Sequence, residues 1–101
     1  SPRHIERTGC FVFVLDMAGP GGRAPTSDFK ALRDELRLHN PDLDTRPFLV
    51  TANKMDCPEA AENLDTFIKA IGIKPIPISA EFNEGIDALR ESIRNKFMAP
   101  A

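Results

Sequence analysis

The sequence has no tryptophan or tyrosine, only two cysteines in 101 residues, and a net charge of -2. Without those aromatic residues, stacking on a nucleic-acid base would depend on the seven phenylalanines, most of which recur at spacings typical of a core. No basic stripe offers an electrostatic footprint for nucleic acid. Cys10 and Cys57 follow no metal-ligand spacing, so no metal site is expected. These absences argue against a nucleic-acid-binding module and a zinc module.

Long apolar runs are absent as well. No signal peptide or membrane span is visible, and the longest apolar run is far too short to cross a bilayer. The remaining composition is that of an ordinary globular protein, with 42% apolar and 28% charged residues. The length fits one domain or part of one. We therefore expect no membrane partner and a reducing, cytoplasm-like compartment.

Apolar runs and helical stripes alternate along the chain. Residues 2–8 are expected to end a helix. Strands are expected at 10–16, 47–53 and 75–79, and helices starting near Thr26, Pro58 and Asn83. Pro75 and Pro77 cannot donate ladder hydrogen bonds, so the last strand should lie at an edge. The order predicts an α/β fold: a three-layer domain with a parallel sheet of three strands and flanking helices.

Polar residues stand at the carboxyl ends of two adjacent predicted strands: Asn53, Lys54 and Asp56 after one, and Ser79 and Ala80 after the next. Ligands of open parallel sheets sit beyond such ends. A carboxylate at Asp56 can accept two parallel hydrogen bonds from guanine, which adenine cannot supply. Lys54 can lay its hydrocarbon stem along the base while its ammonium stays in water, and Asn53 can tie the loop to neighbouring backbone. Ala80 can donate a backbone N–H to the guanine carbonyl oxygen. The Ser79 side chain can hold the Asp56 carboxylate.

Two other interpretations of these segments stay open. In the first, residues 53–57 are a capped helix start, with Asp56 or Cys57 as the N-cap. In the second, the segment from Gly19 to Ala24 fits G-x-G-x-x-[GA] and marks a dinucleotide-binding unit. Pro20 and Pro25 count against the second, because they remove an amide and interrupt the helix start that the motif requires.

Three segments, "RHIERTGCFVFVLDMAGPGGRAPTSDF", "RPFLVTANKMDCPEAAENL" and "PISAEFNEGIDALR", closely resemble the GTPase domain of the Obg family of ribosome-associated GTPases, in the family's order. The resemblance implies that Asn53, Lys54 and Asp56 match its guanine-specificity motif, and that Ser79 and Ala80 match its second base-contacting motif. It also implies that residues 4–8 end a helix.

The phosphate-binding loop G-x-x-x-x-G-K-[ST], the Mg²⁺-binding switch threonine and the D-x-P-G segment of that family are absent. Residues 1–101 therefore resemble the C-terminal half of a GTPase domain, with no catalytic or metal-binding residue expected. The resemblance implies a parent protein of bacterial cytoplasm that binds GTP or GDP with Mg²⁺, hydrolyses GTP and acts in assembly of the large ribosomal subunit.

Two further expectations concern the partial domain. The alternative to a nucleotide-binding role is a non-catalytic module that uses the same fold to dock a partner. In addition, the 10–16 strand would lose a neighbour in such a partial domain, so we expect self-association through its exposed edge.

Overall fold

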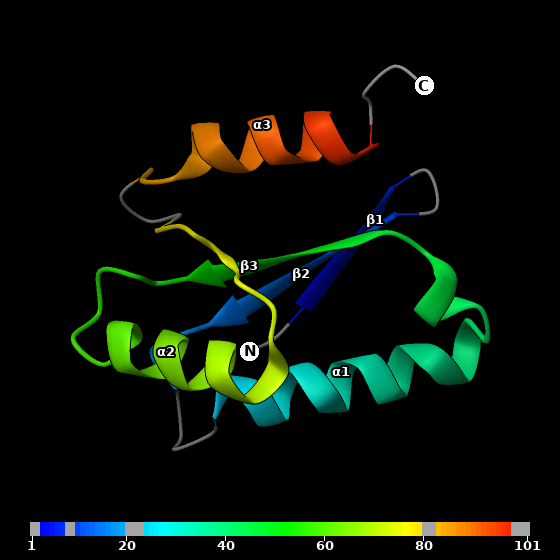
Figure 1. The fold of residues 1–101 in the computed structure, drawn as a ribbon, viewed down its shortest axis with the longest axis horizontal. Coiled ribbons are helices and arrows are strands. Elements are labelled where there is room, and N and C mark those ends of the chain that lie inside the picture. Colours follow the sequence, from blue (N-terminus) through cyan, green and yellow to red (C-terminus); the bar gives the residue numbers. More distant parts are fainter. Residues whose placement is uncertain (1–2, 8–9, 20–23, 80–82, 98–101) are drawn as a thin grey trace.

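The computed structural model describes residues 3–7, 10–19, 24–79 and 83–97, and it has a four-stranded sheet in the order β1-β2-β3-β4. The strands are β1 (Arg3–Arg7), β2 (Cys10–Asp16), β3 (Phe48–Asn53) and β4 (Ile76–Pro77). The helices are α1 (Pro25–His39), α2 (Ala60–Ile71) and α3 (Ile86–Phe97), with a short 3₁₀ turn, η2 (Leu43–Thr45). Figure 1 shows α1 and α2 on one side of the sheet and α3 on the other.

Strands β2, β3 and β4 are parallel, so the predicted α/β fold with a three-stranded parallel sheet and flanking helices is confirmed. This is the arrangement that the resemblance to part of a P-loop GTPase domain implies. β4 lies at the edge, as its prolines predict, but it is shorter than the predicted 75–79 strand. Helix α2 ends at Gly72, which takes φ 80° and donates its N–H to the Ile68 carbonyl oxygen at 2.8 Å.

Residues Arg3–Arg7 form a strand, so the expectation that residues 2–8 end a helix is wrong. β1 pairs antiparallel with β2, with Arg7 opposite Cys10 and Arg3 opposite Val14. Only two residues separate the strands in sequence, a spacing that suits antiparallel neighbours. The outer edge of β2 offers a row of N–H and C=O groups, and an adjacent segment that pairs with it satisfies them.

The same pairing corrects a second expectation. β1 covers the edge of the 10–16 strand from Cys10 to Val14, so most of this edge is not the exposed edge on which self-association was predicted. Among the described residues, β1 is the outer strand on this side of the sheet.

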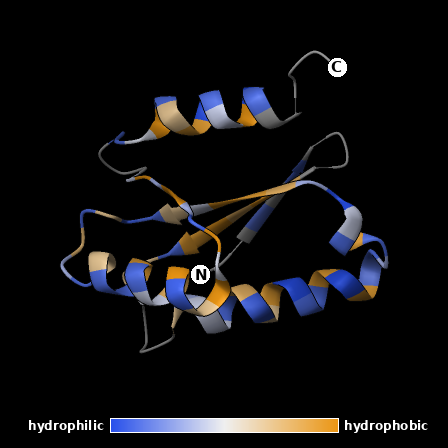
Figure 2. Ribbon diagram, in the orientation of Figure 1, coloured by the Kyte–Doolittle hydropathy of each residue, from blue (hydrophilic) through white to orange (hydrophobic). Residues whose placement is uncertain are grey.

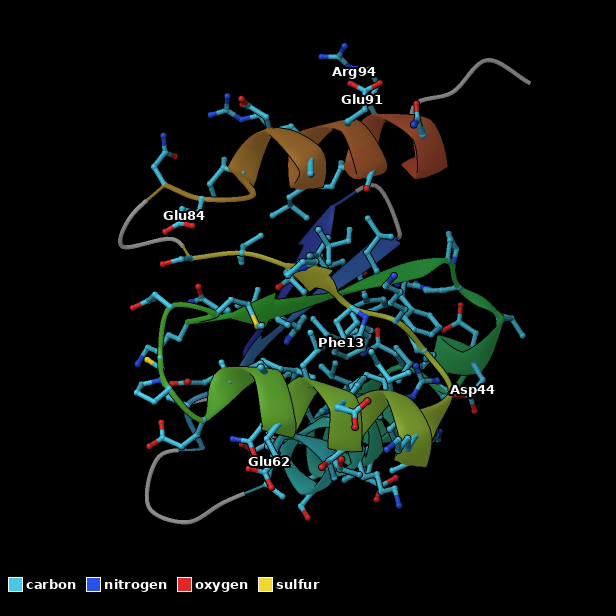
Figure 3. All side chains as sticks on the ribbon, turned by 60° about the vertical axis from the view of Figure 1, so that its left-hand side comes forward. Phe13, Asp44, Glu62, Glu84, Glu91 and Arg94 are labelled. Carbon is cyan, nitrogen blue, oxygen red and sulfur yellow. The ribbon has the colours of Figure 1, made fainter. Side chains whose placement is uncertain are left out.

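The main core lies between the sheet and helices α1 and α2. Alternate residues of β2 point into it, because side chains of a strand alternate between faces; Phe13 and Leu15 are fully buried there. Phe13 packs edge-on against Phe29 of α1, whose ring in turn meets Phe67 of α2. Figure 2 shows the hydrophobic residues gathered along the central strands, and Figure 3 shows Phe13 between the sheet and these helices. The face toward α3 is less completely buried, with Val12 and Val14 half-exposed.

A charged cluster lies beside the amino ends of β2 and β3. The Arg33 guanidinium stands 4.9 Å from the centre of the Phe48 ring and pairs with Asp44. Hydrogen bonds from Arg37 and then Arg33 hold the pKa of the Asp44 carboxyl below its ordinary value. In Figure 3, Asp44 and Glu84 mark opposite ends of the molecule. The carboxyl ends of the strands, where ligands of such sheets bind, therefore lie away from this cluster.

Candidate functional site

The polar residues predicted from the sequence come together at the carboxyl ends of three neighbouring strands. Asp16 ends β2 and lies directly opposite Asn53, which ends β3. β4 pairs with the other side of β3, and Ser79 follows it two residues later. Because the three strands are parallel, residues 53–56 are flanked by the end of β2 on one side and the segment after β4 on the other.

The Asp56 carboxylate is exposed, yet it is held in place. The Ser79 hydroxyl donates a hydrogen bond to Asp56 Oδ1 at 2.7 Å. Ser79 is only 2% exposed, and its backbone N–H and C=O each bond to Glu84 at 2.9 Å. A rigid, buried hydroxyl therefore orients an exposed carboxylate, which keeps acceptor capacity on both oxygens.

The capped-helix interpretation of this segment is wrong. α2 begins at Ala60, and its N-cap position is Glu59, which makes no side-chain capping bond. Neither Asp56 nor Cys57 occupies the cap position, and Pro58 lies ahead of the helix. Two successive turns connect β3 to α2 instead, in which Cys57 N–H bonds to the Lys54 carbonyl and Ala60 N–H to the Cys57 carbonyl.

Lys54 takes a left-handed backbone conformation, with φ 63°. This backbone conformation is uncommon for residues other than glycine, asparagine and aspartate. Its ammonium Nζ lies 3.0 Å from Asp16 Oδ2, while the side chain remains 51% exposed. The sequence predicts this ammonium in water, whereas the structure pairs it with the buried carboxylate of Asp16.

Backbone hydrogen bonds fasten this segment on both flanks. Asn53 is half-buried, and its carbonyl accepts the N–H of Met17 at 3.0 Å. On the other flank, Met55 N–H bonds to the Ile78 carbonyl at 3.1 Å. Asn63 of α2 adds a side-chain bond from Nδ2 to the Met17 carbonyl at 2.7 Å. Sequence reasoning missed Asn63, since nothing in its local pattern shows that it meets a residue 46 positions away.

Two predicted features lie partly or wholly outside the described residues. Ala80, expected to offer a backbone N–H to the guanine carbonyl, is one of them. The other is the Gly-Pro loop of the dinucleotide interpretation, of which residues 20–23 are not described. What the structure does describe is the helix after that loop, which starts at Pro25 with Ala24 as its N-cap and no side-chain capping bond.

Burial and the carboxylates of the site both affect the pKa of the neighbouring Cys57 thiol. Partial burial raises the pKa of Cys57 above its ordinary value, and the nearby Asp56 and Asp16 carboxylates raise it further. Within the described part of the chain, no group of three or more His, Cys, Asp or Glu residues is placed to hold a metal ion, and no helix there is long and apolar enough to cross a membrane.

Together these contacts describe a site suited to recognition. An oriented carboxylate at Asp56 offers two acceptors side by side. Lys54 offers a hydrocarbon stem beside it, and the loop between them is tied to both neighbouring strands. A planar ligand edge with two adjacent N–H donors, such as that of guanine, matches this donor and acceptor set.

Three curated relatives are similar to this chain over most of its length. The chain is 47% identical to a GTPase Obg of Symbiobacterium thermophilum over 93 residues, 48% identical to one of Caldanaerobacter subterraneus over 90, and 42% identical to one of Staphylococcus aureus over 96. These matches cover 86–93% of this chain but only 21–22% of each relative. The chain thus spans about a fifth of the length of these relatives. No protein-family model matches it.

Proposed function

This chain belongs to the Obg family of GTPases, and we propose that residues 53–56 together with Ser79 form the guanine-reading part of a nucleotide site. Residues 1–101 are then a partial GTPase domain that carries the guanine-specificity motifs. In this role Asp56 accepts hydrogen bonds from the two guanine N–H groups, and Lys54 covers the plane of the base. Asn53 anchors the loop, and Ser79 orients the Asp56 carboxylate. Ala80 supplies a backbone N–H to the guanine carbonyl.

One observation carries the proposal: the 2.7 Å hydrogen bond from buried Ser79 to exposed Asp56. It joins the two sequence motifs, which lie 23 residues apart. A carboxylate that served only as a helix cap would point at the α2 amides, and Asp56 does not hold that position. An exposed carboxylate fixed by a buried donor is instead pre-organised for a ligand, because less freedom is lost on binding.

The activity of the parent protein follows as part of the same proposal. The parent protein binds GTP or GDP with Mg²⁺, hydrolyses GTP and acts in assembly of the large ribosomal subunit in the cytoplasm. Bound Mg²⁺ would neutralise charge on the phosphates. We assign no residue of this chain to it, because no group of three or more His, Cys, Asp or Glu among the described residues is placed to hold a metal ion. We propose no hydrolysis step on this chain, because its sequence lacks the family's phosphate-binding loop and switch segments.

The Asp56→Asn substitution in the full-length parent protein tests the proposal. An amide replaces one acceptor with a donor, so guanine loses a hydrogen bond and xanthine, whose carbonyl replaces the exocyclic amine, gains one. We expect GDP affinity to fall by at least about a hundredfold. The affinity for xanthosine diphosphate should rise relative to the affinity for GDP. Isothermal titration calorimetry with both nucleotides measures the change.

Asp65→Asn is the matched control, since it removes a carboxylate that pairs with Lys69 at 2.9 Å on the exposed surface of α2. It should leave both affinities unchanged. Unchanged GDP affinity in Asp56→Asn would show that Asp56 does not read the base. Failure of the unsubstituted parent protein to bind any guanine nucleotide would favour the partner-docking alternative.

A further inference from the structure

Asp16 carries a buried charge beside the guanine-reading segment. It ends β2 and is only 7% exposed. One carboxylate oxygen, Oδ1, accepts the Ala18 N–H at 2.9 Å, and the other, Oδ2, lies 3.0 Å from Lys54 Nζ. The two oxygens therefore have separate partners, one within the same turn and one directly after the neighbouring strand β3.

The turn alone does not account for this residue. An Asp at a strand end commonly bonds the backbone two residues on, and the contact with Ala18 is of that kind. An asparagine or serine oxygen would serve equally well there. What only an ionised carboxylate provides is a charge for Lys54, and a buried charge is costly unless it is paired.

Lys54 is a side chain that needs such a partner in order to be placed. Its four-carbon stem has many rotamers and therefore high conformational entropy, and half of the side chain faces solvent. Pairing with a carboxylate that is itself fixed in the sheet limits the directions the stem can take. That freedom is then given up during folding and not on ligand binding.

We propose that Asp16 is a positioning residue for nucleotide binding, which holds Lys54 by its ammonium so that the stem is ready to cover the base. This inference rests on the proposed function, because it needs the base to lie on Lys54. Asp16 itself touches no ligand in this arrangement. It acts on affinity through Lys54 and has no part in telling guanine from other purines, which falls to Asp56.

The test is a double-mutant cycle in the full-length parent protein, with GDP affinity as the readout. Asp16→Asn keeps the acceptor for Ala18 and removes the charge, while Lys54→Met keeps an apolar stem and removes the ammonium. Each single variant should bind GDP about five- to tenfold more weakly, which is within the cost of ordering one long side chain on binding. The double variant should bind GDP with the same affinity as the single variant that binds GDP less tightly, because both changes break the same contact.

A purely structural role for Asp16 would give a different result. Its loss would then reduce affinity by the same factor whether or not Lys54 is present, and the two effects would multiply in the double variant, which would overturn the inference. Asp16→Ser, whose hydroxyl can also accept the Ala18 N–H, must reproduce the loss seen in Asp16→Asn. It also replaces that variant if Asp16→Asn fails to fold.

A further arm separates this inference from the proposed function. In the Asp56→Asn background, Asp16→Asn should weaken binding of xanthosine diphosphate by the same factor, about five- to tenfold, since the same side chain must be ordered on binding. The preference between bases should not change. If Asp56→Asn switches the base preference but the Asp16 and Lys54 effects multiply, only the positioning role is wrong. If Asp56→Asn causes no switch, both proposals fail.

Discussion

Removing the Ser79 hydroxyl tests the contact that joins the two base-contacting motifs. Ser79→Ala deletes the donor that lies 2.7 Å from Asp56 Oδ1 and changes little else, because alanine fills nearly the same volume in this buried position. The backbone bonds between Ser79 and Glu84 do not involve the side chain. We therefore expect the fold to be retained and Asp56 to become freer to rotate.

The size of the effect follows from the burial of the two partners. A hydrogen bond to a charged group contributes about 1.5–3 kcal/mol when its loss leaves a buried partner unsatisfied. Asp56 is exposed, so water replaces the lost donor, and the remaining cost is that of ordering one side chain on binding, about 0.5–1.5 kcal/mol. Because 1.4 kcal/mol corresponds to a factor of ten, Ser79→Ala should weaken GDP binding by about two- to twelvefold.

Calorimetric titration of the full-length parent protein with GDP and with xanthosine diphosphate measures this. Unlike Asp56→Asn, Ser79→Ala should produce no relative gain for xanthine, since the carboxylate is still present. Thr45→Ala is the control, because it also deletes a hydroxyl that makes a 2.7 Å bond, to the Asp42 carbonyl, in η2 at the far end of the molecule. Equal GDP affinity for Ser79→Ala and Thr45→Ala would refute the reasoning.

Three further predictions concern the chain itself. The purified 101-residue chain should show no GTP turnover and no GDP binding in the micromolar range by calorimetry, since the family's phosphate-loop sequence is absent from it; measurable turnover would contradict this. Gly85→Ala should lower the free energy of unfolding by about 2 kcal/mol or more in urea titration. The Cβ of the new alanine would stand 2.3 Å from the Pro77 carbonyl oxygen, at a position with φ 75°. As a comparison, Ala88→Gly in α3 should lower the free energy of unfolding by about 1 kcal/mol. Alkylation of Cys57, followed by peptide mass spectrometry, should rise with pH at a higher midpoint than for a free thiol, because its pKa is raised; a midpoint below that of a free thiol would show the reverse.

The main features of the fold follow from local sequence patterns. The apolar run at 10–16 and the run ending at Asn53 became strands β2 and β3 at the predicted places, because short apolar runs rich in β-branched and aromatic residues are typical of strands buried on both faces. Parallel pairing then follows from the intervening helices. That the polar residues 53–56 and Ser79 share one end of the sheet is a consequence of this order and needs no tertiary information.

The positions that sequence reasoning placed wrongly depend on partners far away in the chain or on a neighbouring edge. Residues 3–7 have no decisive period, and they form a strand because the adjacent edge of β2 offers hydrogen bonds. Pro58 resembles a first helical residue, yet two turns carry the chain past it and α2 starts at Ala60. Local propensity sets only weak preferences at such boundaries, which tertiary contacts override.

The sequence by itself determined the kinds of groups at the site and the end of the sheet at which they stand, since both follow from residue type and from strand direction. Only the tertiary structure decided how these groups are held. Asp16 meets Lys54 across the β2–β3 pair, Ser79 meets Asp56 across the β3–β4 pair, and Asn63 reaches back to Met17. Each contact joins residues 23 to 46 positions apart, and no local pattern encodes a hydrogen bond whose two partners are brought together only when the sheet and its helices pack.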